Sequence, residues 1–139
     1  MMLQLQRNNA MAEPLETEIL SPGDAKKIRR IYENKFPESR TGIFVVHELV
    51  QNVLQHGHKH FGKVKANTDV IETIQEVEDA AALKELQNLI AEAEGDVSAC
   101  SSGSTCNGHG IGFEMILASG WLLHAFLRGK ELHIVATKK

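Results

Sequence analysis

The first half of the chain carries two predicted helical segments, and the second is marked by apolar residues at helical spacing. In the second segment, five aliphatic residues lie three or four positions from one another, which predicts one apolar helix face. They are Ile43, Val46, Val50, Val53 and Leu54. We expect this helix to end near Gly57. The earlier helix is predicted over residues 21–35. Ser21 is a good N-cap, Pro22 suits the first helical position, and Asp24 completes a weak capping box.

The remaining pattern predicts a short strand, two further helical segments and a final hairpin. In chain order these are a strand at 62–66, a helical segment over 70–94 with a candidate break near Asp79, a helix at 110–118, and strands at 122–127 and 131–137. Residues 95–110 are rich in Gly, Ser, Thr and Asn, which predicts a loop. Because strands lie on either side of a helical insert, we expect an α+β fold with helices on one face of a mixed or antiparallel sheet.

Length and composition indicate one domain. Residues 1–20 show no sustained period, so we expect a weakly structured N-terminal segment followed by a single domain over 21–139. Hydrophobic residues make up 42% of the 139 residues and charged residues 24%, as in a soluble globular protein. Aromatic residues are only 5%, which predicts an aliphatic core.

The net charge of the chain limits the kinds of molecule that it is expected to bind. The formal net charge of -3 provides no global basic field, which argues against a nucleic-acid binder. The chain has no apolar run of about 18 residues, and its start lacks the order of a secretory signal. We therefore expect a cytoplasmic protein that does not bind a membrane. Residues 69–96 contain nine acidic residues and a single basic residue, Lys84. A segment with this charge predicts a solvated surface.

A glycine-rich element precedes the predicted helix at 110–118. Its sequence is Asn107-Gly108-His109-Gly110-Ile111-Gly112. Glycines at alternate positions let backbone N–H groups approach an anion, and a helix N-terminus adds partial positive charge, so phosphate is the natural ligand. A loop in which the glycines only permit a tight turn is an equal alternative.

The polar face of the helix at 43–56 carries a carboxylate and an amide one turn apart. Glu48 and Asn52 stand at i and i+4, so their side chains project side by side. Glu48 is a candidate base or water-orienting group, and Asn52 is a candidate oxygen ligand to Mg²⁺. Taken alone, such a pair is more often an ordinary polar helix surface.

Together the two elements resemble motifs of a known superfamily. The segment from His47 to Gly57 resembles the N box of the GHKL ATPases and kinases, and the segment from Gly108 to Phe113 resembles their second glycine box. The order of the boxes is also that of the superfamily. The pattern Glu-x-x-Gln-Asn, an acidic helical segment and a late Gly-x-Gly-x-Gly look most like the SiaB-type protein kinases. The resemblance implies a Bergerat fold, a two-layer α/β sandwich that binds Mg-ATP.

The resemblance also implies roles for single residues. Glu48 would be the catalytic base, Asn52 the Mg²⁺ ligand and His56 part of the ATP pocket. The phosphates would be wrapped by Gly108, His109, Gly110, Ile111 and Gly112. The superfamily's first glycine box, Asp-x-Gly-x-Gly, supplies the aspartate that recognises adenine, and it is absent between residues 58 and 100. The resemblance therefore assigns no residue to the base.

The histidines and cysteines support a different interpretation. His56, His58 and His60 alternate along the chain, and imidazoles so spaced can converge on a transition metal. Cys100 and Cys106 match no standard zinc spacing and are expected to be reduced thiols. A polar turn over the nucleotide site is the simpler explanation of the histidine cluster.

These patterns lead to one expectation and two rivals. The resemblance favours an ATP-binding regulator, a bacterial protein-serine kinase that acts on a small partner of the anti-sigma-antagonist type. One rival is a catalytically inactive module on the same fold, which would act like an anti-sigma factor by docking a partner. The other is a metal-responsive protein that uses the histidine cluster. The sequence does not decide between a monomer and a homodimer.

Overall fold

The computed structural model describes residues 13–56, 62–77, 81–100 and 111–139. These residues form five strands and four helices. In chain order they are β2 (Leu15–Ile19), α2 (Asp24–Lys35), α3 (Arg40–His56), β3 (Gly62–Ala66), β4 (Val70–Glu76), α4 (Ala81–Cys100), α5 (Ile111–Ala118), β5 (Trp121–Arg128) and β6 (Glu131–Lys138). The expected helices at 43–56 and 110–118 and the final hairpin are confirmed.

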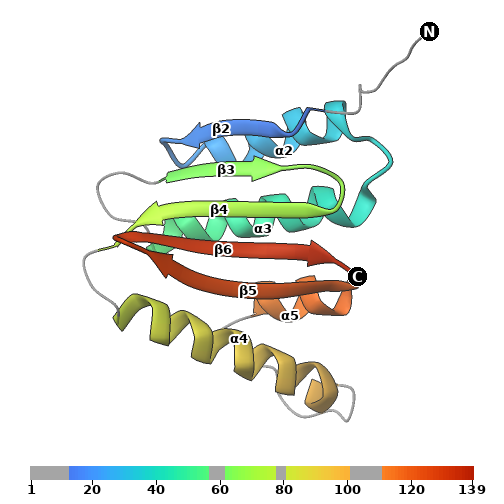
Figure 1. Cartoon of the computed structure of the whole chain (residues 1–139). Coiled ribbons are helices and arrows are strands. Elements are labelled where there is room, and N and C mark those ends of the chain that lie inside the picture. Colours follow the sequence, from blue (N-terminus) through green and yellow to red (C-terminus); the bar gives the residue numbers. More distant parts are fainter. Residues whose placement is uncertain (1–12, 57–61, 78–80, 101–110) are drawn as a thin grey trace, which may run out of the picture.

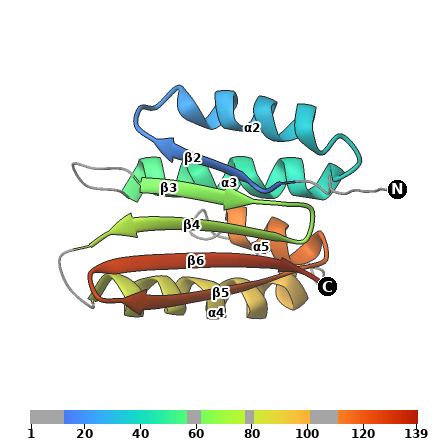
Figure 2. The ribbon, with the colours of Figure 1, turned by 45° about the horizontal axis from the view of Figure 1, so that its top comes forward.

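The strands form one sheet in the order β2-β3-β4-β6-β5, and each of its pairings is antiparallel. Helices α2, α3 and α5 cover one face of this sheet (Figures 1 and 2). Helix α4 packs against α5 and lies along the edge strand β5 (Figure 1). The α+β class and a sheet with helices layered on one face are therefore confirmed.

The segment over 70–94 corrects the sequence prediction. Residues 70–76 form β4 instead of a helix, and α4 begins only at Ala81 and continues to Cys100. In β4 the buried residues alternate with more exposed ones, and Ile71, Thr73 and Gln75 all face the helices. Period-two burial is the mark of a strand, and it is imposed here by pairing with β3 and β6. The expected loop is likewise helical over residues 95–100.

The start of the chain also differs from the prediction. Residues 15–19 are not weakly structured, because they pair with β3 as strand β2 and bury Leu15 and Ile19. Helix α2 begins at Asp24 instead of Pro22. The Asp24 carboxylate accepts hydrogen bonds from the backbone N–H groups of Leu20 (2.7 Å) and Ser21 (3.1 Å). The Leu20 bond is the main reason that the pKa of Asp24 lies below its ordinary value.

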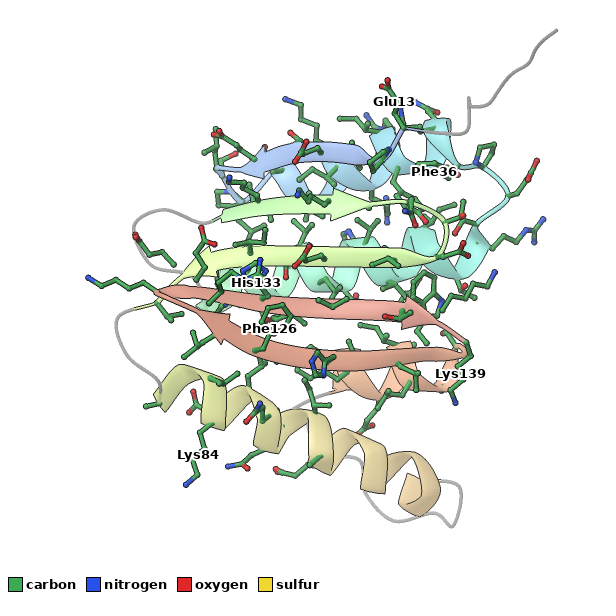
Figure 3. The ribbon with its side chains drawn as sticks, viewed as in Figure 1. Glu13, Phe36, Lys84, Phe126, His133 and Lys139 are labelled. Carbon is green, nitrogen blue, oxygen red and sulfur yellow. The ribbon has the colours of Figure 1, made fainter. Side chains whose placement is uncertain are left out.

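The opposite face of the sheet holds a polar contact between strands. His133 Nδ1 of β6 lies 2.6 Å from Glu72 Oε2 of β4. The His133 ring stacks on the ring of Phe126 in β5, with centroids 4.7 Å apart (Figure 3). This histidine therefore links three strands, on the face away from α2, α3 and α5.

A buried hydroxyl joins α2 to the turn between β3 and β4. Tyr32 Oη lies 2.9 Å from Ser39 Oγ and donates to the backbone oxygen of Asn67 at 2.9 Å. Burial raises the pKa of Tyr32 above its ordinary value, so the hydroxyl stays protonated. Gly42 of α3 passes so close to both hydroxyls that a β-carbon there would overlap them. This corner therefore brings together α2, the start of α3 and the turn after β3.

Removing the hydroxyl with Tyr32→Phe is expected to lower the free energy of unfolding by about 1–2 kcal/mol, because buried partners lose a hydrogen bond. Urea denaturation followed by circular dichroism measures the change. Glu33→Gln, at an exposed neighbouring position of α2, is the matched control. Equal stabilities of Tyr32→Phe and the control would show that the corner contributes nothing.

Candidate functional site

One flank of α3 carries the candidate catalytic pair. Thr41, Glu48 and Asn52 are separated by seven and four residues, so they lie along the same side of the helix. Thr41 Oγ1 accepts a hydrogen bond of 2.9 Å from Trp121 Nε1 at the start of β5. Since α5 packs on both α3 and β5, this flank of α3 is turned toward α5. Glu48 and Asn52 are both half-buried there.

The sheet supplies a polar floor beneath the boundary between the two helices. Helix α3 packs on β2, β3 and β4, while α5 packs on β5. The strand order therefore places β4 and β6 beneath the place where α3 and α5 meet. Strand β4 turns Thr73 and Gln75 toward the helix layer, with 1% and 5% of their surfaces exposed. Among the residues that the structure describes, none hydrogen-bonds Thr73 Oγ1 or Gln75 Oε1.

Helix α5 forms the other side of this site. It begins at Ile111 and Gly112, so the end of the glycine element coincides with a helix N-terminus, as the phosphate-site hypothesis requires. Glu114 lies in the first turn of α5 and is only 7% exposed. Gly108, His109 and Gly110 lie outside the described residues, so their predicted part in phosphate binding stays a prediction.

Three buried polar residues were missed by the sequence analysis: Thr73, Gln75 and Glu114. The first two were hidden because residues 70–76 were assigned to a helix, in which they have no special position. In a strand, polar residues at alternate positions of a buried face are unusual, and that signal could have identified them. Glu114 could have been noticed as the only charged residue between Ile111 and Ala118.

The oxygen-bearing side chains of α3 and α5 are of the kinds that bind a hard cation. Asn52 offers an amide oxygen from α3, and Glu48 and Glu114 bring carboxylates from α3 and α5 into the same helix layer. Carboxylate and amide oxygens are the protein ligands that Mg²⁺ accepts, usually one or two of them together with substrate phosphates. The donor set therefore fits a Mg²⁺-nucleotide, with Asn52 as its predicted protein ligand.

The metal-responsive interpretation gains no support from the described residues. Within residues 13–56, 62–77, 81–100 and 111–139, no group of three or more His, Cys, Asp or Glu residues is arranged to hold a metal ion. His56 is the last residue of α3, and Cys100 is the last residue of α4. His58, His60 and Cys106 lie outside the described residues, so the interpretation itself stays untested.

None of the helices that the structure describes is both long enough and apolar enough to cross a membrane. Comparison with protein-family models, with curated proteins and with solved structures finds no match for the chain.

Proposed function

We propose that this protein is an ATP-binding regulator, a protein-serine kinase that phosphorylates a small partner protein of the anti-sigma-antagonist type. One observation carries the proposal: the flank of α3 with half-buried Glu48 and Asn52 is turned toward α5, which begins at Ile111, directly before Gly112. A carboxylate, an amide and a glycine-rich helix start are the groups that phosphoryl transfer requires around a nucleotide. The Bergerat assignment and its motif roles rest on the sequence resemblance.

The chain's own residues would divide the work. Asn52 would bind Mg²⁺ through its side-chain oxygen, and the backbone N–H groups of 108–112 would bind the phosphates, with His56 beside them. When bound, Mg-ATP supplies the phosphoryl group that is transferred. Glu48 would accept the proton that the partner's serine hydroxyl releases as its oxygen bonds to the γ-phosphorus and the bond between that phosphorus and ADP breaks.

Partial burial of the pair would strengthen this chemistry. Glu48 and Asn52 are neither at the open surface nor in the apolar core, where Leu49 and Val53 of the same helix pack. A site that is shielded from water on several sides makes each charge interaction stronger than it would be in bulk water. Positioning and electrostatics are the main contributions that a protein makes to phosphoryl transfer.

Isothermal titration with Mg-ATP and Mg-ADP tests the proposal. We expect saturable binding with a dissociation constant between about 1 µM and 1 mM, the range in which enzymes usually bind their substrates. Asn52→Ala should weaken binding of Mg-ATP while leaving binding of metal-free ATP nearly unchanged. Asn34→Ala, on the exposed side of α2, is the matched control. Absence of heat with millimolar nucleotide would refute the proposal.

A further inference from the structure

Gln75 is a buried amide whose oxygen has no partner among the described residues. It is 5% exposed. Thr73, two residues earlier in β4, is 1% exposed, and its hydroxyl oxygen also has no hydrogen-bond partner among the described residues. Burying a polar atom without a hydrogen bond is unfavourable, and buried polar atoms in native proteins nearly always have partners, among which ligands and ordered waters count. Both side chains face the helix layer, on the strand that packs against α3. They are therefore placed to hydrogen-bond a ligand within that layer.

The two sheet neighbours of Gln75 offer its amide no hydrogen bond. Across β6 its partner in the sheet register is Leu132, which offers no hydrogen bond. On the other side lies Gly62 of β3, where an added β-carbon would be 3.3 Å from the Gln75 Cα. Since Gly62 has no side chain, β3 contributes no polar group beside the amide. Within the described part of the chain, no hydrogen bond holds the Gln75 oxygen in one direction.

A free amide is complementary to both purine bases. A glutamine side chain has an acceptor oxygen beside a donor nitrogen, whereas a carboxylate only accepts. Adenine presents its N6–H donor beside the N1 acceptor, and guanine presents the O6 acceptor beside its N1–H donor. One orientation of the amide pairs with adenine, and the orientation turned by 180° pairs with guanine. The Thr73 hydroxyl, two residues away on the same face of β4, both donates and accepts.

We propose that Gln75, with Thr73 beside it, recognises the base of the bound nucleotide, and that the site takes ATP and GTP nearly equally. This inference rests on the proposed nucleotide site and assigns the base, for which the sequence motifs provide no residue. It predicts that selectivity between the two purines is set by the amide. A group that only accepts hydrogen bonds at position 75 would create a preference that the natural side chain lacks.

The test is isothermal titration of the full chain with Mg-ATP and Mg-GTP, using the natural protein, Gln75→Leu and Gln75→Glu. For the natural protein the two dissociation constants should agree within about threefold. Gln75→Leu should weaken both by about tenfold, the effect of losing one hydrogen-bonding group in a buried site. Gln75→Glu should shift the preference toward GTP by about tenfold, because guanine donates from N1–H and N2–H while adenine N1 needs a donor.

Asn34→Leu, an amide removed from the exposed side of α2, is the control and should bind as the natural protein does. The melting temperature of Gln75→Leu should be no lower than that of the natural protein, because the variant no longer buries an amide without a hydrogen-bond partner. If Gln75→Glu does not fold, Thr73→Val, which removes only a hydroxyl, should still weaken the binding of both nucleotides by several-fold.

The outcomes separate this inference from the proposed function. If both Gln75→Leu and Thr73→Val bind ATP as the natural protein does, the proposed role of these two residues is wrong. The proposed nucleotide site is not contradicted by that result. A natural protein that prefers one purine by about a hundredfold or more, roughly 2.7 kcal/mol, overturns the equal acceptance of ATP and GTP. Failure of the natural protein to bind either nucleotide overturns the proposed function and this inference together.

Discussion

Glu48→Gln is expected to lower the rate of phosphoryl transfer by about 10²–10⁴-fold, which is the usual contribution of a positioned general base. The glutamine keeps the size of the side chain and its place on α3, but it cannot take up the proton of an attacking hydroxyl. Binding of Mg-ATP should change by less than about threefold, since Glu48 is proposed to act on the nucleophile instead of the nucleotide. Release of labelled phosphate to water, and transfer to a candidate partner protein, measure the rate.

The control for this variant is Glu33→Gln, which makes the same chemical change at an exposed position of α2. Transfer by Glu48→Gln at the rate of the control would exclude Glu48 as the base. If both the natural protein and Glu48→Gln bind Mg-ATP and neither transfers phosphate, the non-catalytic docking module becomes the better description.

Trp121→Ala is expected to lower the free energy of unfolding by about 3–5 kcal/mol, the usual result of truncating a large buried aromatic residue. Trp121 is fully buried at the start of β5, and its ring nitrogen donates to Thr41 at the start of α3. The residue thus joins the edge of the sheet to the helix that carries Glu48 and Asn52. Because domains of this kind are stable by only about 5–15 kcal/mol, the variant should be close to unfolding at 37 °C.

Urea denaturation followed by far-ultraviolet circular dichroism measures this loss. Thr41→Val removes only the hydrogen bond and should cost about 1 kcal/mol. Leu122→Ala, on the half-exposed neighbouring residue, should change stability by less than about 0.5 kcal/mol. A loss below about 1 kcal/mol for Trp121→Ala would mean that the site does not depend on this junction. Trp121 is the only tryptophan in the chain, so its fluorescence reports the same unfolding in the natural protein.

Elements with a clear apolar period were predictable from the sequence. The helix at 43–56 has its aliphatic residues three and four apart, and Val46, Val50 and Val53 are indeed fully buried. Strand β4 was not predictable in this way. The helical apolar pattern that runs from Val77 to Ala93 was extended back over it to Val70, whereas pairing with β3 on one side and β6 on the other decides the conformation. Strand propensity depends on such neighbours more than helix propensity does.

The candidate site was predictable only where it depends on local spacing. The positions of Glu48 and Asn52 on one helix flank follow from an interval of four residues. That this flank is turned toward α5 depends on the contact between Thr41 and Trp121, which are 80 residues apart in the sequence. The polar floor made by Thr73 and Gln75 depends on the strand order of the sheet, which no local pattern encodes.

The strand order has a consequence for how the chain reaches its native state. Strand β4 pairs with β6 instead of β5, and in this pairing Val70 meets Thr137. During synthesis β4 would therefore leave the ribosome well before its partner and present an unpaired edge with Ile71 and Val77 beside it. Such edges invite pairing with other chains. We therefore expect this edge to need protection while the chain is being made. We also expect a slow final folding step, in which the hairpin of β5 and β6 docks on β4 and completes the centre of the sheet.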